Sequence, residues 1–215
     1  MRRRVIAYDS AKPSIVWTDS GYDAATLGKT VFTFSGKSVG TAHPKRFVFV
    51  ATDITPDTMT IAGVSATKFV QAGALSIWGA LVPTGSTATI VLTTIGTPGR
   101  GIRIQVLAAY NLLSTTPFAT TSVSLGVAVG TINVNVNTPA FGVVVAASSN
   151  FRSDPAASWS GATLGNNLNV GLDTISAASV SDVAAQTPRS VSVTWPVAFE
   201  LGAALWIYRQ SEPLG

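Results

Sequence analysis

The sequence contains no cysteine, and His43 is its only histidine. Without cysteine, the chain can form neither a disulfide framework nor a thiolate metal site, so apolar burial and strand pairing must hold the fold together. A single histidine also excludes a zinc site that needs two or more histidines from one chain. We therefore expect no cofactor and no metal ion.

Charge is also scarce, because only 11% of the 215 residues are charged, whereas about a quarter is usual in soluble proteins. Hydrophobic residues make up 47%, yet the longest apolar runs, such as residues 141–147, are far shorter than the roughly 20 residues that cross a membrane. We expect no membrane insertion. Serine, threonine, asparagine and glycine replace the charges, which predicts a subunit whose surface is covered by other protein chains.

The formal net charge is +4, but the basic residues are scattered instead of clustered on one face, so we expect no nucleic-acid partner. Arg2, Arg3 and Arg4 follow Met1, but Asp9 and Lys12 interrupt the apolar stretch that a secretion signal would need. We interpret these three arginines as part of a docking arm.

Period-two alternation of apolar and polar residues dominates the sequence from about residue 30 onward. In residues 131–137, Ile132, Val134 and Val136 alternate with asparagines, and residues 190–195 and 87–92 follow the same pattern. Such alternation predicts antiparallel strands with one buried face and one wet face. The asparagine face is expected to keep the strand soluble without charge.

Other segments are apolar on both faces and predict central or covered strands, namely residues 47–50, 75–82, 141–147 and 203–208. Many short strands separated by glycine and proline turns favour a sandwich over a parallel sheet. We predict an all-β chain that forms a single antiparallel β-sandwich, jelly-roll-like, with a short N-terminal arm. Residues 1–28 are assigned to the arm, as a possible docking segment, and residues 29–215 to the sandwich domain.

Three pieces of the sequence resemble β-sandwich structural proteins of tailed-bacteriophage virions and related gene-transfer particles. They are residues 59–67 with their Gly63-Val64 end, residues 76–85 with the Pro83-Thr84-Gly85 turn that leads into strand 87–93, and residues 158–162 together with strand 203–208. The resemblance implies a virion component of the tail fibre or tip kind, or a head decoration protein, assembled in the bacterial host cytoplasm. It supplies no list of functional residues.

Catalytic residues are not predicted, and we expect no enzyme. Residues 36–40 match the Gly-x-Ser-x-Gly string of hydrolases, but no helical pattern follows them, as the strained strand-to-helix turn of that motif requires. The few acidic residues form no recognisable pair for acid–base chemistry, and turn hydrogen bonds explain Asp53 and Asp57 more simply than an ion does.

Aromatic side chains provide the one candidate ligand contact, because their faces stack on sugar rings. Trp159 stands in a Ser-Gly-rich segment with Asn166, Asn167 and Asn169 downstream, so these four residues are the candidate glycan contacts. Core packing is the competing explanation for the tryptophans within strands, such as Trp78 and Trp195.

The sequence therefore predicts a non-enzymatic structural component of a tailed-phage virion that assembles through apolar β surfaces, with a tail association. Its expected partners are copies of itself, with a trimer as one option, and other virion proteins. The alternatives are a carbohydrate-binding adhesin or receptor-binding module that contacts host-surface polysaccharide, and a head decoration protein.

Overall fold

The computed structural model describes residues 12–112, 114–125, 130–138, 140–151, 156–171, 173–183, 185–196 and 200–209. Every regular element within these ranges is a β-strand, all the pairings are antiparallel, and none of these residues belongs to a helix that could span a bilayer. The predicted all-β, antiparallel sandwich is confirmed.

The N-terminal half contributes two sheets. Its strands are β1 (Ser14–Asp23), β2 (Val31–Ser38), β3 (Phe47–Thr52), β4 (Thr58–Ile61), β5 (Val64–Ser65), β6 (Thr67–Ala72), β7 (Leu75–Leu81), β8 (Thr87–Thr93) and β9 (Ile102–Tyr110). The N-terminal inner sheet has the order β1-β9-β3-β7-β6, and the N-terminal outer sheet has the order β2-β8-β4-β5.

The C-terminal half contributes two further sheets. Its strands are β10 (Ala119–Leu125), β11 (Thr131–Thr138), β12 (Gly142–Phe151), β13 (Ser158–Ser160), β14 (Thr163–Val170), β15 (Asp173–Val183), β16 (Gln186–Thr194) and β17 (Glu200–Arg209). The C-terminal inner sheet has the order β10-β17-β12-β15-β14, and the C-terminal outer sheet has the order β11-β16-β13.

The two halves share one topology. In each inner sheet the first strand of the half (β1 or β10) lies beside the last (β9 or β17). The third strand (β3 or β12) follows, and then the pair β7-β6 or β15-β14. In each outer sheet the second strand pairs with β8 or β16, which then pairs with β4 or β13. This is the jelly-roll arrangement, so the predicted jelly-roll-like sandwich occurs twice in the chain, a repetition that the sequence did not reveal.

Glycines mark the same turns in both halves. Gly63 and Gly161 have φ values of 78° and 76° after β4 and β13, and Gly73 and Gly171 have φ values of 58° and 69° in the hairpins that lead to β7 and β15. Only glycine enters this left-handed region without strain. The repeated glycines therefore support the equivalence of the two halves.

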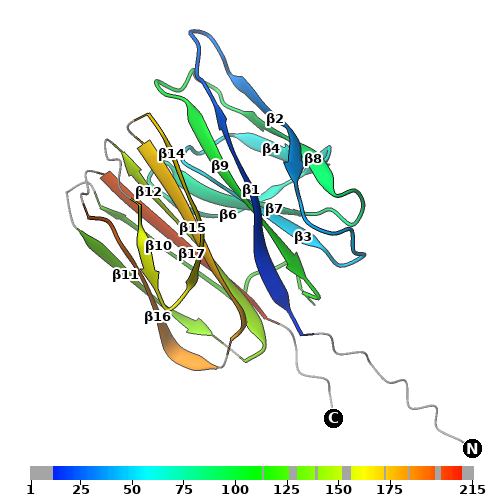
Figure 1. The fold of residues 1–215 in the computed structure, drawn as a ribbon, viewed down its shortest axis with the longest axis vertical. Coiled ribbons are helices and arrows are strands. Elements are labelled where there is room, and N and C mark those ends of the chain that lie inside the picture. The colour runs from blue at the N-terminus through cyan, green and yellow to red at the C-terminus, as the bar shows by residue number, and fades with distance from the viewer. Residues whose placement is uncertain are drawn as a thin grey trace, which may run out of the picture.

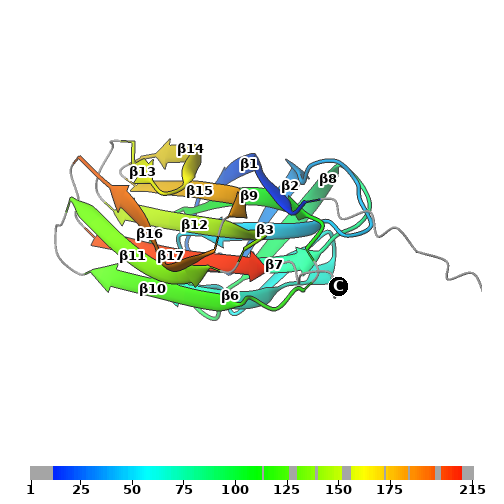
Figure 2. The same ribbon diagram turned by 90° about the horizontal axis from the view of Figure 1, so that it is seen from below.

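The four sheets stack as four layers, with the inner sheets face to face in the middle. One apolar core fills the N-terminal sandwich around Trp78, another fills the C-terminal sandwich around Trp195, and a third joins the inner sheets around Phe49 and Ile175. Figures 1 and 2 show the halves side by side, with β2, β4 and β8 on one flank and β11 and β16 on the other.

Layer position explains the two kinds of strand in the sequence. All residues of β3 are buried because both faces of an inner sheet are covered, and β12 is buried along all but its last residue. In contrast, β11 alternates strictly between exposed and buried residues because only one face of an outer sheet is covered. The predictions for residues 47–50, 75–82 and 131–137 are confirmed, except that Leu81 within the second segment is exposed.

The N-terminal region is only partly described. Residues 14–23, which the sequence assigned to an arm, form β1 and pair with β9 at the edge of the N-terminal inner sheet. Arg2, Arg3 and Arg4 lie outside the described residues. The docking role of the arm stays a prediction.

We predict that Phe49→Ala lowers the free energy of unfolding by about 3–5 kcal/mol, because it opens a cavity in the core between the inner sheets. Since this core is shared, both halves should unfold in one transition, which urea titration monitored by tryptophan fluorescence would measure. Leu164→Ala is the control, because Leu164 is exposed and its loss should cost less than about 0.5 kcal/mol. Two separate transitions would contradict a shared core.

Candidate functional site

A buried ionic cluster joins the two halves. Arg103 projects from β9 toward the C-terminal half, and its Nη1 donates to Asp53 Oδ2 at 2.9 Å and lies 3.2 Å from Asp173 Oδ2. The backbone N–H of Arg103 donates to Asp53 Oδ1 at 2.9 Å, and Nη2 of the Arg103 side chain donates to the carbonyl of Val170. Asp53 and Arg103 are almost completely buried. The cluster thus connects the end of β3 to the β14–β15 hairpin.

Two further contacts strengthen this junction. Arg100 Nη2 donates to the Asp53 carbonyl at 2.8 Å, and its guanidinium stacks at 3.4 Å from the ring centre of Phe151, in the C-terminal half. Burial raises the pKa of Asp53, an effect that the hydrogen bonds and positive charge of Arg103 partly offset. The charged groups of this arrangement are buried and bond to one another across the two halves, a geometry that indicates a structural tie.

A glutamine forms a second polar connection between the inner sheets. Gln105 is fully buried on β9, and its Oε1 accepts a hydrogen bond from Trp17 Nε1 at 2.8 Å. Its Nε2 donates to the carbonyl of Ile175 at 3.0 Å, and Asn166 Nδ2 donates to Oε1 at 3.4 Å. Asn166, a predicted glycan contact, thereby helps to hold the halves together.

The other predicted glycan contacts lie on β13 and β14, which follow each other in the chain but belong to different sheets. Trp159 on β13 is half-buried against the C-terminal core, and its Nε1 donates to Ser176 Oγ at 2.8 Å. Asn167 exchanges two hydrogen bonds with the backbone of Ala157, at 3.2 and 3.3 Å. Asn169 is exposed on β14. The polar atoms of Trp159 and Asn167 are used within the chain, and glycan contact at these residues stays a prediction.

His43, Lys45 and Arg46 are close together in the sequence, but the fold gives their side chains different surroundings. Arg46 is fully buried and donates to the carbonyls of Val82, Gly40 and Thr84, each at 2.7 Å. His43 packs edge-on against Tyr110, with the ring centres 5.8 Å apart. Of this group, Lys45 stays exposed. Among the described residues, no cluster of three or more histidine or acidic side chains could hold a metal ion.

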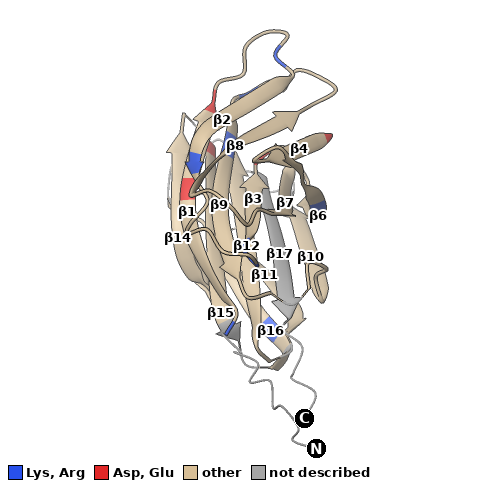
Figure 3. Cartoon of the chain, turned by 90° about the vertical axis from the view of Figure 1, so that its right-hand side faces the viewer, with Lys and Arg blue, Asp and Glu red and all other residues tan. Residues whose placement is uncertain are grey.

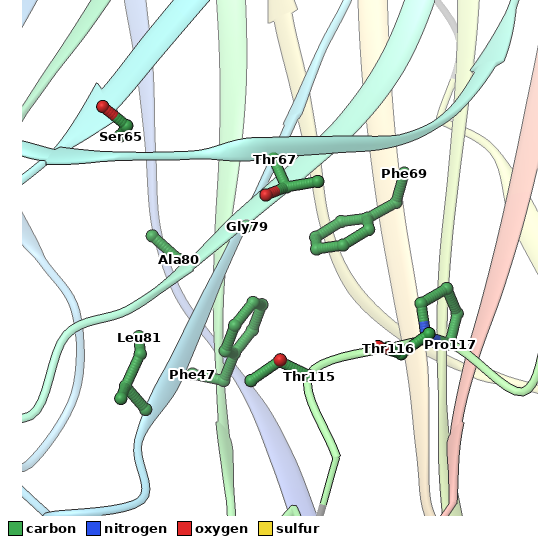
Figure 4. Close-up of a pocket in the computed structure, with 10 residues that line it drawn as sticks. All are labelled: Phe47, Ser65, Thr67, Phe69, Gly79, Ala80, Leu81, Thr115, Thr116 and Pro117. Atoms are coloured by element: carbon green, nitrogen blue, oxygen red, sulfur yellow. The ribbon is translucent and has the colours of Figure 1, made fainter.

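A groove opens beside the segment that links the two halves, which runs from the end of β9 to the start of β10. Its larger part has a volume of about 550 Å³, and a smaller hollow shares Phe47, Leu81 and Thr115 with it. We call the two together the Phe47 groove. Its lining, much of which Figure 4 shows, consists of Pro44, Lys45, Phe47, Ser65, Thr67, Phe69, Gly79, Ala80, Leu81, Leu112, Thr115, Thr116 and Pro117.

The groove is apolar at its base and hydroxylated at its rim. Phe47 and Phe69 lie 6.0 Å apart between ring centres, directly over Gly79, where a Cβ would approach Phe47 Cε1 to 2.4 Å. Leu81 is 46% exposed. Lys45 is the one charged residue of this lining. A groove of this size and character suits an uncharged, largely apolar occupant.

The outer faces of the outer sheets carry uncharged side chains. On the C-terminal outer sheet the exposed face consists of hydroxyl and amide groups, contributed by Thr131, Asn133, Asn135, Asn137, Ser158, Ser160, Ser190, Ser192 and Thr194. On the N-terminal outer sheet the outer face is also uncharged, but it mixes threonine hydroxyls with two valines; its residues are Val31, Thr33, Thr58, Thr60, Thr89, Val91 and Thr93. Figure 3 shows how few charged residues interrupt the chain. Sequence reasoning anticipated the asparagine stripe but not its extension across three strands.

No protein-family model and no curated protein matches the sequence. Among solved structures, a conserved protein of unknown function from Pseudomonas aeruginosa PAO1 is similar over 93% of this chain and 100% of its own, with 13% identity and a TM-score of 0.31. The major capsid protein P2 of bacteriophage PM2 aligns over 94% and 99%, with 8% identity and a TM-score of 0.28. HutD from Pseudomonas fluorescens SBW25 aligns over 92% and 100%, with 15% identity and a TM-score of 0.25. Likenesses of this strength carry no information about function.

We predict that Arg103→Met lowers the free energy of unfolding at pH 7 by about 3–5 kcal/mol, because it leaves Asp53 buried without its counter-charge. Denaturant titration would measure the loss, with Lys68→Met as the exposed control. The double variant Arg103→Met/Asp53→Asn should recover part of the stability, since the two residues form one network. Additive losses would contradict the network.

The raised pKa of Asp53 predicts a pH dependence of stability. Because the folded pKa lies above the unfolded value of about 4, the contribution of Asp53 is fully present below that value and is lost as pH rises through the folded pKa. The unfolding free energy of wild type relative to Asp53→Asn should therefore fall as the pH rises above about 4, as urea titrations at increasing pH would show. A difference independent of pH would contradict this assignment.

Proposed function

We propose that the chain is a non-enzymatic structural subunit of a tailed-phage virion that assembles with copies of itself and with neighbouring virion proteins. The observation that carries this proposal is the pair of charge-free outer faces on a body with two stacked sandwiches. Covering a charged face requires the removal of water from ions, which costs several kcal/mol per ion. Hydroxyl and amide groups need only new hydrogen-bond partners, so such faces suit coverage by protein.

Exposed apolar side chains add a second kind of assembly contact. Leu27 and Ile95 are almost completely exposed and lie on neighbouring loops. A hydrogen bond of 2.9 Å from the Thr94 N–H to the Thr30 carbonyl joins these loops. Val31, at the start of β2, is 48% exposed next to them. We call Leu27, Val31 and Ile95 the apolar tip. Burial of such side chains against another chain would contribute about 25 cal/mol per Å² before the costs of association.

Within the virion we propose a tail position, at the fibre or tip, because the exposed amide and hydroxyl face suits contact with a host surface. Three pieces resemble tailed-phage structural proteins and support a virion role: residues 59–67, residues 76–85 with strand 87–93, and residues 158–162 with strand 203–208. Labelling the protein in intact particles and imaging them would distinguish tail from head.

A carbohydrate-binding module is the second candidate. The observation that favours it is the asparagine stripe, where Asn133, Asn135 and Asn137 are exposed on one flat face among serine and threonine hydroxyls. Lectin domains are among the known uses of jelly rolls. This candidate, unlike a purely structural subunit, requires saturable binding of host polysaccharide.

We predict that Leu27→Ser/Ile95→Ser weakens self-assembly at least about tenfold while changing the unfolding free energy by less than about 0.5 kcal/mol, because both side chains are exposed. Light scattering over a concentration series would measure the assembly. Leu164→Ser is the matched control on a different surface. A wild-type protein that stays at its 22.2 kDa monomer mass at all concentrations, and that is never incorporated into particles, would overturn the proposed function.

A further inference from the structure

The Phe47 groove lies at the end of the N-terminal inner sheet where the described chain begins. Asn111 Nδ2 donates to the carbonyl of Lys12 at 3.4 Å, and the next residue, Leu112, lines the groove. Ser14 pairs with Tyr110, and Phe47 pairs with both Ala109 and Leu81 at the same end of the sheet. The residues that precede Lys12 therefore enter the fold next to an open apolar hollow.

We propose that residues 5–8 of the same chain occupy the Phe47 groove. These residues are Val5, Ile6, Ala7 and Tyr8, an apolar segment that ends in a side chain with one hydroxyl. Phe47, Phe69 and Leu81 provide the apolar contacts for such a segment. The hydroxyls of Thr67 and Thr116 at the rim can bond the Tyr8 hydroxyl and the backbone of the segment.

The length of the preceding chain fits this placement. The strand order in the sheet is β1-β9-β3-β7, so β3 is the second strand from β1 and β7 is the third. At the usual spacing of strands, β3 lies about 10 Å from β1 and β7 about 14 Å. An extended chain covers about 3.3 Å per residue. Tyr8 can therefore lie about 13 Å from Lys12, above β3, and Val5 can lie about 23 Å away, beyond β7.

The charges along this path also match. Lys45 lines the part of the groove that includes Leu112, which is the end where the segment would enter. Asp9 directly follows Tyr8 in the sequence, so it would stand at this entrance and pair with Lys45. Arg2, Arg3 and Arg4 would follow at the far end, past the uncharged Ser65 and Thr67 rim, where solvent can keep them hydrated.

The absence of cysteine makes this docking directly testable in the full-length chain. The double variant Ile6→Cys/Leu81→Cys places one thiol on the segment and one on the exposed Leu81 in the groove. A disulfide needs Cβ atoms within about 4.5 Å. Under mild oxidation we expect an intramolecular cross-link with monomer mass, reversed by reductant, in at least about tenfold greater yield than in the control.

The control is Ile6→Cys/Leu164→Cys. Leu164 is similarly exposed, at 42%, and it also lies near β1, because Gly165 packs against Trp17. Equal cross-linking in the two variants would mean a mobile segment and would overturn the proposal. Cross-linked dimers in place of monomers would also overturn it, because the groove would then bind the segment of a second copy.

A charge exchange provides an independent test of the register. Adding Asp9→Lys to the Ile6→Cys/Leu81→Cys variant should lower the yield of the cross-link several-fold, because the new positive charge would face Lys45. Adding Lys45→Asp as well should restore the yield. A yield that does not respond to Asp9→Lys would contradict the proposed entrance. Since monomer cross-linking does not depend on assembly, the proposed function can fail while this docking holds, and the reverse is also true.

Discussion

The contact between the two inner sheets is the constraint on which the rest of the structure depends. Each inner sheet has two apolar faces, so neither half could leave its inner sheet uncovered in water without exposing a large apolar surface. Packing the inner faces together around Phe49, Val145 and Ile175 resolves this for both halves at once. The arrangement places β1 over β14 and β15, and β10 beside β6. It resembles a two-fold dimer joined into one chain.

Polar groups at this contact determine how the halves are aligned. The carboxylates of Asp53 and Asp173 meet the guanidinium of Arg103, and Gln105 bonds the backbone of Ile175 and the side chain of Trp17. A buried ion pair contributes little net stability compared with apolar packing, but breaking it is costly. A shift of one sheet over the other by one residue would leave these groups unsatisfied. The cluster therefore favours one alignment among several that apolar packing alone would allow.

The same stacking leaves the outer sheets with one free face each. Because the inner contact is inside the chain, the charge-free outer faces and the apolar tip are surfaces that other chains can cover. These two surfaces differ in chemistry, since the outer faces carry hydroxyl and amide groups and the tip consists of aliphatic side chains. A subunit with two distinct surfaces can contact more than one kind of neighbour, as the proposed virion role would require.

The strand class of most segments could be predicted from sequence, because burial on one face or two leaves a period-two pattern or a continuous apolar run in residues such as 131–137 and 47–50. Candidate site residues were harder to predict. Trp159 and Asn166 have the residue types of a glycan site, but their hydrogen bonds to Ser176 and Gln105 depend on neighbours brought from other strands. Likewise, Arg103 and Gln105 alternate with Ile102, Ile104 and Val106, a pattern that ordinarily indicates a wet polar face.

The sequence by itself determined the all-β class, the antiparallel strands, the scarcity of charge and the absence of thiol chemistry, because these follow from local periodicity and composition. Only the tertiary structure decided that the jelly roll occurs twice, that the polar face of β9 is buried against the other half, and that a groove forms beside the linker. Such features arise from contacts between residues far apart in the chain. Side-chain periodicity indicates that a face is polar or apolar, but not which surface of the folded chain will cover it.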